Sequence, residues 1–266
     1  MTRHKLMPDR TAFVFPEMDD PRPALGLHKH LRQGENLPSH SHVRGQLFAM
    51  RQGSMAVITK DRAYVLPPHR ALWIPPGEEH ACSHLEQAQM RTLYLDQSLS
   101  CRLPARTTMV TLSGLLNELI ETVLNLSSDP DRVHEVARLI EVIIDQFRGN
   151  IGHALSLKMP SSPKVRMVAE AMMKRENSEL PLEHLARLAG FSLRSLERKF
   201  KQETGLTLRG YRSQVRIMWA IELLTMGNSI TETSIMLNYE NPSSFTHAFK
   251  KSVGVAPREF VKTSLS

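Results

Sequence analysis

One helical pattern occurs twice in the C-terminal part of the chain, and this repetition constrains the fold more than any other feature. Over residues 182–201 (LEHLARLAGFSLRSLERKFK) the spacing predicts a helix of eight residues or so, a turn at Gly190 and a second helix capped by Ser192. Glycine adopts the left-handed conformation of such a turn at little cost, and serine is a favoured N-cap. The pattern therefore predicts a helix-turn-helix.

The second unit spans residues 230–251. It has a short helix to Leu237, a turn over residues 238–241, and a helix that begins at Pro242 after Asn241 as its cap. Asn238 stands where the first unit has Gly190, and asparagine tolerates the left-handed conformation. Residues 207–226 between the units have the spacing of one long helix, which we expect to fix the separation of the two units.

Basic residues are concentrated in the same region. The formal net charge is +7, and residues 164–266 hold 16 Lys and Arg against 10 Asp and Glu, whereas residues 1–163 hold 18 against 17. A positive excess on one domain is expected where the partner carries negative charge. The second helix of the first unit would expose Arg194, Arg198 and Lys201, which suit the base edges and phosphates of a DNA major groove.

Residues 164–262 resemble the DNA-binding domain of the AraC/XylS family of bacterial transcription regulators. The matching residues include Leu185-Ala186, Ala189-Gly190-Phe191-Ser192, Leu196, Arg198, Phe200-Lys201, Phe245, Ala248-Phe249-Lys250-Lys251, Gly254-Val255 and Pro257. The resemblance implies double-stranded DNA as a partner and assigns DNA contact to Arg194, Ser195, Glu197, Arg198, Lys201, Pro242, Ser243, Thr246, His247 and Lys250. The residues assigned in the second unit, from Pro242 to Lys250, include no arginine. We therefore expect this helix to make fewer sequence-specific base contacts and more contacts with the DNA backbone.

The first half of the chain has a different period. Apolar runs at residues 46–50, 55–59, 63–66 and 71–75 have the length of strands, and Gly- and Pro-containing turns separate them at the spacing typical of a small β-barrel. From Val110 onward apolar residues recur at helical spacing, and Asp129-Pro130 predicts the start of a second helix. The resulting hairpin either packs on the barrel or pairs with a second subunit, and the sequence leaves both open.

A histidine pair lies near the start of this region, in HSHVRGQ at residues 40–46. His40, His42 and Gln46 fit the cupin spacing H-x-H-x3-E, with Gln46 in place of Glu, and Pro75, Gly77 and His80 fit the second cupin motif, P-x-G-x2-H. Residues 24–95 thus resemble a cupin, a double-sheet β-barrel, and the resemblance implies that these histidines point into its lumen. Alternate strand residues share a face, so His40 should meet His42.

Three roles for the histidines remain open on the sequence. In the first, the histidines bind a divalent transition metal (Ni, Zn, Fe or Cu), for which neutral imidazole is a common ligand. Alternatively, they line a metal-free pocket for a small polar effector, or they are structural. The candidate effector or metal site comprises His40, His42, Gln46 and His80, and further candidate pocket residues are Cys82, His84, Arg44 and Trp73.

Taken together, these patterns predict an α+β protein of two domains. The expected units are a cupin-like sensor at residues 1–108, a helical dimerisation hairpin at 109–150, a linker at 151–163, and an all-α domain with two helix-turn-helix motifs at 164–266. The expected function is ligand-responsive transcription regulation and not catalysis. The alternative is a metal-dependent cupin enzyme with a helical appendage, against which the missing carboxylate at Gln46 argues.

The run from His40 to Gln46, followed by Trp73 and Pro75-Pro76-Gly77, also resembles regulators of neighbouring efflux-transporter genes, including genes for nitroimidazole transport. It implies a transporter or efflux gene as the target, with RNA polymerase and a second copy of the chain as further partners. The chain has no apolar run long enough to span a membrane, and its first twenty residues lack the apolar region of a secretory signal, so we expect neither a membrane span nor secretion. With only two cysteines, it is expected in the cytoplasm.

Overall fold

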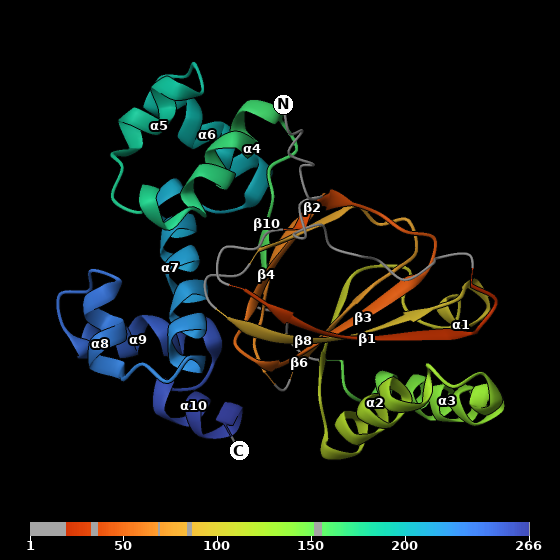
Figure 1. The fold of residues 1–266 in the computed structure, drawn as a ribbon. Coiled ribbons are helices and arrows are strands. Elements are labelled where there is room, and N and C mark those ends of the chain that lie inside the picture. Colours follow the sequence, from red (N-terminus) through yellow and green to blue (C-terminus); the bar gives the residue numbers. More distant parts are fainter. Residues whose placement is uncertain (1–19, 33–36, 69, 84–86, 152–155, 266) are drawn as a thin grey trace, which may run out of the picture.

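The structure is a computed structural model that describes residues 20–32, 37–68, 70–83, 87–151 and 156–265. A β-barrel forms the N-terminal part, a helical hairpin covers one of its faces, and an all-helical domain lies against another side (Figure 1). This is the two-domain α+β architecture that the sequence predicts. Among the described residues, no helix has both the length and the apolar character needed to cross a membrane.

Two five-stranded sheets build the barrel. One has the strand order β1-β8-β3-β6-β9 and the other the order β10-β5-β4-β7-β2. The strands are β1 (Ala24–Leu31), β2 (Leu37–His40), β3 (Gly45–Gln52), β4 (Met55–Thr59), β5 (Arg62–Leu66), β6 (Arg70–Ile74), β7 (His80–Ser83), β8 (Ala88–Leu95), β9 (Thr108–Thr111) and β10 (Ser156–Lys158). The four apolar runs predicted as strands are confirmed as β3, β4, β5 and β6.

Alternation along β3 separates two hydrophobic cores. Phe48 and Met50 face the lumen between the sheets, where they pack with Tyr64 and Leu66 of β5. Leu47 and Ala49 face the opposite way, into a second core shared with the helical hairpin. Large side chains therefore fill much of the barrel interior.

The hairpin consists of α2 (Gly114–Leu126) and α3 (Val133–Gly149), joined by a short 3-10 helix at Pro130–Arg132, with α1 (Gln97–Ser100) preceding β9. The side chain of Asp129 accepts a hydrogen bond from Asp131 N, as its predicted capping role requires. The first helix begins at Gly114, later than the periodicity indicates, because residues 108–111 add a strand to the sheet. The hairpin packs on the barrel, while Leu115 and Val142 remain exposed on it.

The C-terminal domain contains α4 (Pro163–Met172), a 3-10 helix at Arg175–Asn177, α5 (Leu182–Leu188), α6 (Leu193–Thr204), α7 (Leu208–Thr225), α8 (Ile230–Met236), α9 (Pro242–Val253) and α10 (Pro257–Leu265). The pairs α5–α6 and α8–α9 lie towards opposite ends of the long helix α7 (Figure 1). Both turns adopt the left-handed conformation, with φ of 74° at Gly190 and 54° at Asn238. The two predicted helix-turn-helix units and the long helix between them are confirmed.

The two domains share a hydrophobic core. Ala63 and Val65 of β5 belong to the same buried cluster as Val165 of α4 and Tyr211 of α7. The predicted linker, residues 151–163, includes strand β10, which pairs with β5 in antiparallel register. Met159, the residue after β10, accepts a hydrogen bond on its Sδ from the Tyr211 hydroxyl of α7, at 3.3 Å. Part of the connection is therefore built into both domains.

A buried acid lies in α7. Glu222 is 4% exposed, and its Oε2 lies 3.9 Å from Arg175 Nη2. Burial raises the pKa of this carboxyl to about 7, against the opposing effect of Arg175. Because the folded-state pKa is raised, the contribution of Glu222 favours folding below pH 4.5 and is lost as the pH rises through 7.

Glu222→Gln is therefore expected to stabilise the protein most at alkaline pH. The gain in unfolding free energy should be small at pH 4.5 and reach about 3 kcal/mol at pH 8, since the pKa rises from 4.5 to about 7 and each pKa unit corresponds to about 1.4 kcal/mol. Urea unfolding of both proteins at the two pH values measures it. An equal difference at pH 4.5 and pH 8 would contradict the assignment.

Candidate functional site

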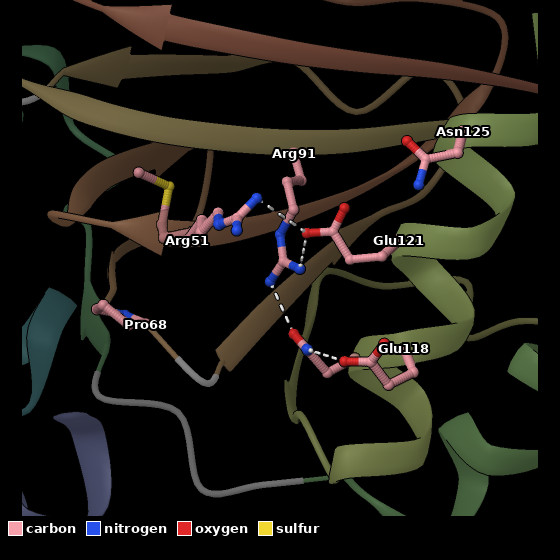
Figure 2. Close-up of a pocket in the computed structure, with 8 residues that line it drawn as sticks. Arg51, Pro68, Arg91, Glu118, Glu121 and Asn125 are labelled. Carbon is pink, nitrogen blue, oxygen red and sulfur yellow. Dashed lines mark hydrogen bonds and ion pairs between the residues drawn. The ribbon is translucent and has the colours of Figure 1, made fainter. Parts of the chain in front are cut away.

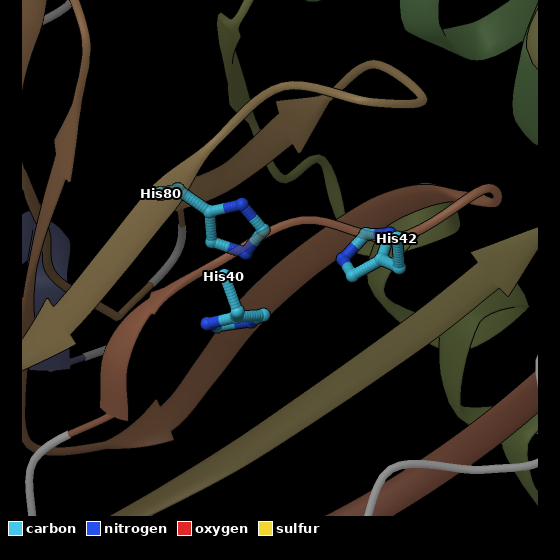
Figure 3. A group of neighbouring side chains, drawn as sticks. All are labelled: His40, His42 and His80. Atoms are coloured by element: carbon cyan, nitrogen blue, oxygen red, sulfur yellow. The ribbon is translucent and has the colours of Figure 1, made fainter.

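Three histidines converge inside the barrel. His40 ends β2, His42 lies in the loop that follows, and His80 begins β7 (Figure 3). One ring nitrogen of each lies within 4.8 Å of those of the other two. Register explains the approach of two of them, because His40 pairs directly with His80 across β2 and β7. The convergence inferred from the cupin spacing is thus observed, although His42 reaches the cluster from a loop and not from a strand.

Backbone carbonyls fix how the rings are protonated. Nδ1 of His40 lies 2.8 Å from Pro38 O, Nδ1 of His80 lies 2.9 Å from Glu78 O, and Nδ1 of His42 lies 2.5 Å from Arg44 O. A carbonyl only accepts, so each Nδ1 carries the proton and donates it. In a neutral ring protonated at Nδ1, Nε2 carries the lone pair that binds a ligand, which is the usual arrangement in histidine metal sites. At His42 this nitrogen is engaged by Gln46.

Burial keeps two of these rings neutral. It lowers the pKa of His80 to about 4, and the neighbouring His40 and His42 lower it further. Burial also lowers the pKa of His42, although its hydrogen bonds with Gln46 and Arg44 oppose the shift. His80 is fully buried, and its Nε2 has no hydrogen-bond partner among the described residues. Such a buried acceptor without a partner points to a ligand, since orphaned polar atoms are costly.

Gln46 is the fourth member of the site. Its side-chain oxygen lies 2.8 Å from His42 Nε2, and its nitrogen contacts Thr92 Oγ1 at 3.2 Å and the Tyr94 hydroxyl at 2.9 Å. A neutral His42 that donates through Nδ1 accepts at Nε2. A half-turn of the Gln46 amide would present its N–H₂ to that nitrogen and its oxygen to the two hydroxyls. Thr92 and Tyr94, both on β8, were not predicted from the sequence.

The further candidate pocket residues have different locations. Cys82 is buried in the lumen core beside the histidines, and burial raises the pKa of its thiol to about 12. Arg44 is buried but donates to the backbone carbonyls of Arg22, at 2.9 Å, and Asp20. Trp73 packs against Phe147 on the hairpin side of the sheet. His84 lies outside the described residues.

Glycine in HSHVRGQ is explained by Trp73. A Cβ on Gly45 would lie 2.0 Å from Cη2 of the Trp73 ring, so only glycine lets the indole lie against β3. Trp73 Nε1 donates to Pro104 O at 2.8 Å, which fixes the ring. The glycine of this run therefore supports packing next to the site and is not itself a ligand.

Two exposed helices form the candidate DNA interface. The predicted contact residues of α6 and α9 are exposed, except Thr246, which is half-buried and donates its hydroxyl to Pro242 O at 2.8 Å. Leu196 and Phe200 anchor α6 in the core, and Phe245 and Phe249 anchor α9. Ser192 and Asn241 cap the two helices through their side-chain oxygens, as predicted. Each helix therefore presents one polar face at a fixed angle.

Comparison with known families decides what this arrangement belongs to. Residues 27–158 match the AraC-like ligand binding domain, and residues 185–263 match a helix-turn-helix domain.

The chain belongs to the AraC family of transcriptional regulators.

Among its relatives, the HTH-type transcriptional regulator NimR of Escherichia coli is 29% identical over 224 residues, which cover 84% of this chain and 82% of NimR. YobQ of Bacillus subtilis, an uncharacterized HTH-type transcriptional regulator, is 24% identical and covers 86% of this chain and 90% of its own length. Among solved structures, ToxT of Vibrio cholerae matches 91% of this chain and 98% of its own at 11% identity, with a TM-score of 0.39. The two matched domains make the regulator a DNA-binding transcription factor with a ligand-binding domain.

Proposed function

We propose that the barrel of this regulator senses a divalent transition metal, and that occupancy of the histidine site alters the affinity of the C-terminal domain for DNA. The observation that carries the proposal is the convergence of His40, His42 and His80, in which the buried Nε2 of His80 has no hydrogen-bond partner among the described residues. Three imidazoles suit Zn, Ni, Cu or Fe, because these metals readily take imidazole nitrogen as a ligand.

The filled lumen favours a metal over an organic effector at this site. The ring centroids of Phe48 and His80 are 5.9 Å apart. Met50, Tyr64 and Leu72 pack in the same core as Phe48. A metal ion would need only the space between the rings. With Gln46 in place of a carboxylate, the described cluster offers no acid or base other than imidazole, which supports sensing and not catalysis.

A direct path leads from the histidines to the DNA-binding domain. His80 of β7 pairs with Thr59 of β4. Arg166 of α4 donates from Nη2 to the Thr59 carbonyl at 3.2 Å and from Nη1 to the Lys60 carbonyl at 2.6 Å. Asp61 O in the same turn accepts from Met159 N at 2.8 Å. A shift of His80 on metal binding would therefore reach α4 through one strand pair and one arginine.

The remaining partners follow from the surfaces that the fold exposes. We infer that the α2–α3 hairpin forms a homodimer interface, because Leu115 and Val142 are 54% and 40% exposed on it. Sequence reading is assigned to α6 and α9. A neighbouring transporter or efflux gene as the target, RNA polymerase as a partner and a cytoplasmic location stay predictions from the sequence.

DNA binding measured with and without metal tests the proposal. The protein should bind DNA from upstream of its own gene, and added Zn²⁺ or Ni²⁺ should change that affinity by about 5–150-fold, the usual range of coupling between two sites. Arg166→Gln should keep both metal and DNA binding but lose the change in affinity. Arg106→Gln, which removes a charge at an exposed position outside this path and outside the hairpin, is the matched control and should keep it.

One outcome would contradict the proposal itself, and another would contradict only the path through Arg166. If no first-row divalent metal binds the wild-type protein, the histidines are not a metal sensor. If metal binds and changes DNA affinity equally in the wild type and in Arg166→Gln, the sensor stands, but the signal takes another route, such as the hairpin.

A further inference from the structure

A second cavity lies on the other side of the sheet from the histidines. It has a volume of about 410 Å³ and lies between strands β3 and β8 on one side and helix α2 on the other (Figure 2). Alternation on β8 directs Arg91 to this face, together with Leu93 of the hairpin-side core. Arg51 lies where the register of β3 against β8 shifts, and it also lines the cavity. Cavities of this size hold small organic ligands in other proteins.

Arginines supply the sheet wall of the cavity. Arg91 is 4% exposed and donates to Glu121 Oε1 at 2.7 Å and to Asn117 Oδ1 at 2.9 Å. Its Nε is buried and has no hydrogen-bond partner among the described residues. Arg51 Nη1 lies 4.0 Å from the same Glu121 oxygen, beyond hydrogen-bond distance. The two guanidinium groups therefore surround one carboxylate and retain donors that it does not use.

Helix α2 supplies the opposite wall. Asn117, Glu121 and Asn125 are spaced four residues apart, so they form one polar stripe beside the apolar stripe that packs on the sheet. Glu118 lines the cavity at its exposed side and lies 3.3 Å from Asn117 Nδ2. The cavity thus has two arginines on the sheet side and an acceptor carboxylate at its rim, and Pro68 also lines it.

We propose that this cavity is a second effector site, which binds a small organic acid with a hydrogen-bond donor at its far end. The carboxylate of the ligand would accept from Arg91 Nε and from Arg51, and the donor would meet Glu118. Charge-assisted hydrogen bonds of this kind are the stronger ones in proteins. A ligand held between β3, β8 and α2 would fix the helix against the sheet, and this inference does not depend on metal binding at the histidines.

The test uses 4-hydroxybenzoate as the probe and 4-hydroxybenzamide as its neutral counterpart of the same shape. The full-length protein, labelled with ¹⁵N-arginine, is titrated while the side-chain Nε–H signals are followed by NMR. The Arg91 signal, assigned with an Arg91→Lys variant, should move saturably with the acid and remain in place with the amide. Arg51→Gln should weaken acid binding about tenfold, the loss expected for one charge-assisted hydrogen bond.

Arg132→Gln is the matched control, because Arg132 is also exposed but pairs with Glu135 on the hairpin, outside the cavity. It should bind the acid as the wild type does. The proposal is overturned if the acid leaves the Arg91 signal unmoved, if the amide moves it equally, or if Arg51→Gln binds with unchanged affinity. Because the readout involves neither metal nor DNA, its failure would leave the proposed metal sensor untouched.

Discussion

Replacing Arg194 and Arg198 together by alanine is expected to abolish most sequence-specific DNA binding. Both side chains are exposed on α6, one helical turn apart, on a helix anchored by Leu196 and Phe200. An arginine that contacts a guanine through two hydrogen bonds contributes about 1–3 kcal/mol of discrimination. The pair should therefore cost about 2–6 kcal/mol, or roughly 30-fold to 10⁴-fold in affinity for the specific site.

Fluorescence anisotropy at fixed salt, with the upstream DNA and with random DNA, measures this effect. Arg32→Ala with Arg106→Ala removes the same two charges from exposed positions outside the hairpin and the C-terminal domain, and it should leave both affinities near the wild-type values. If the α6 variant lost affinity equally for both DNAs, the arginines would contact phosphates and not bases. Retained specific binding would remove α6 from the assigned reading surface.

Local signals explain why the helical domain was predicted well. Gly190 and Asn238 each require a left-handed backbone, and Ser192 and Asn241 each cap the next helix with their own side chain. These preferences depend on the residue and its immediate neighbours. A helix-turn-helix therefore leaves its boundaries in the sequence, and the predicted ends of its helices differ little from those observed.

Long-range pairing explains what the sequence did not predict. Strand β10 forms because residues 156–158 pair with residues 62–64. The run is only three residues long and precedes a Pro- and Ser-rich segment, so the local sequence predicts a linker there. Thr92 and Tyr94 reach Gln46 only because β8 pairs with β3. No spacing rule connects residues so far apart, so these members of the site required the fold.

Trp73 differs, because strand alternation contains the information. Gln46 pairs with Ile74, and Leu47 pairs with Trp73. The face that holds Gln46 and Ile74 is the lumen, so Trp73 must point to the hairpin. Combining the cupin spacing with the two-residue period would have placed the indole outside the histidine site.

His80→Ala is expected to lower metal affinity by more than 100-fold. Changing a residue that merely supports a metal ligand costs about 10–100-fold, and loss of a ligand should cost more. His80 is the most buried of the three histidines, and its Nε2 has no hydrogen-bond partner in the described part of the chain. Competition with a coloured chelator for Zn²⁺ and Ni²⁺ gives the affinity of each protein.

His134→Ala is the matched control, because His134 is exposed on α3, away from the barrel lumen. It should bind metal as the wild type does. Alanine at residue 80 leaves a cavity in the lumen, so unfolding free energies of both variants separate lost stability from lost ligation. A folded His80→Ala protein with wild-type metal affinity would show that the metal does not bind at this site.

The same variant also separates a sensor from a structural metal site. Since His80 also pairs with Thr59, His80→Ala should still bind DNA, but its DNA affinity should no longer change when metal is added.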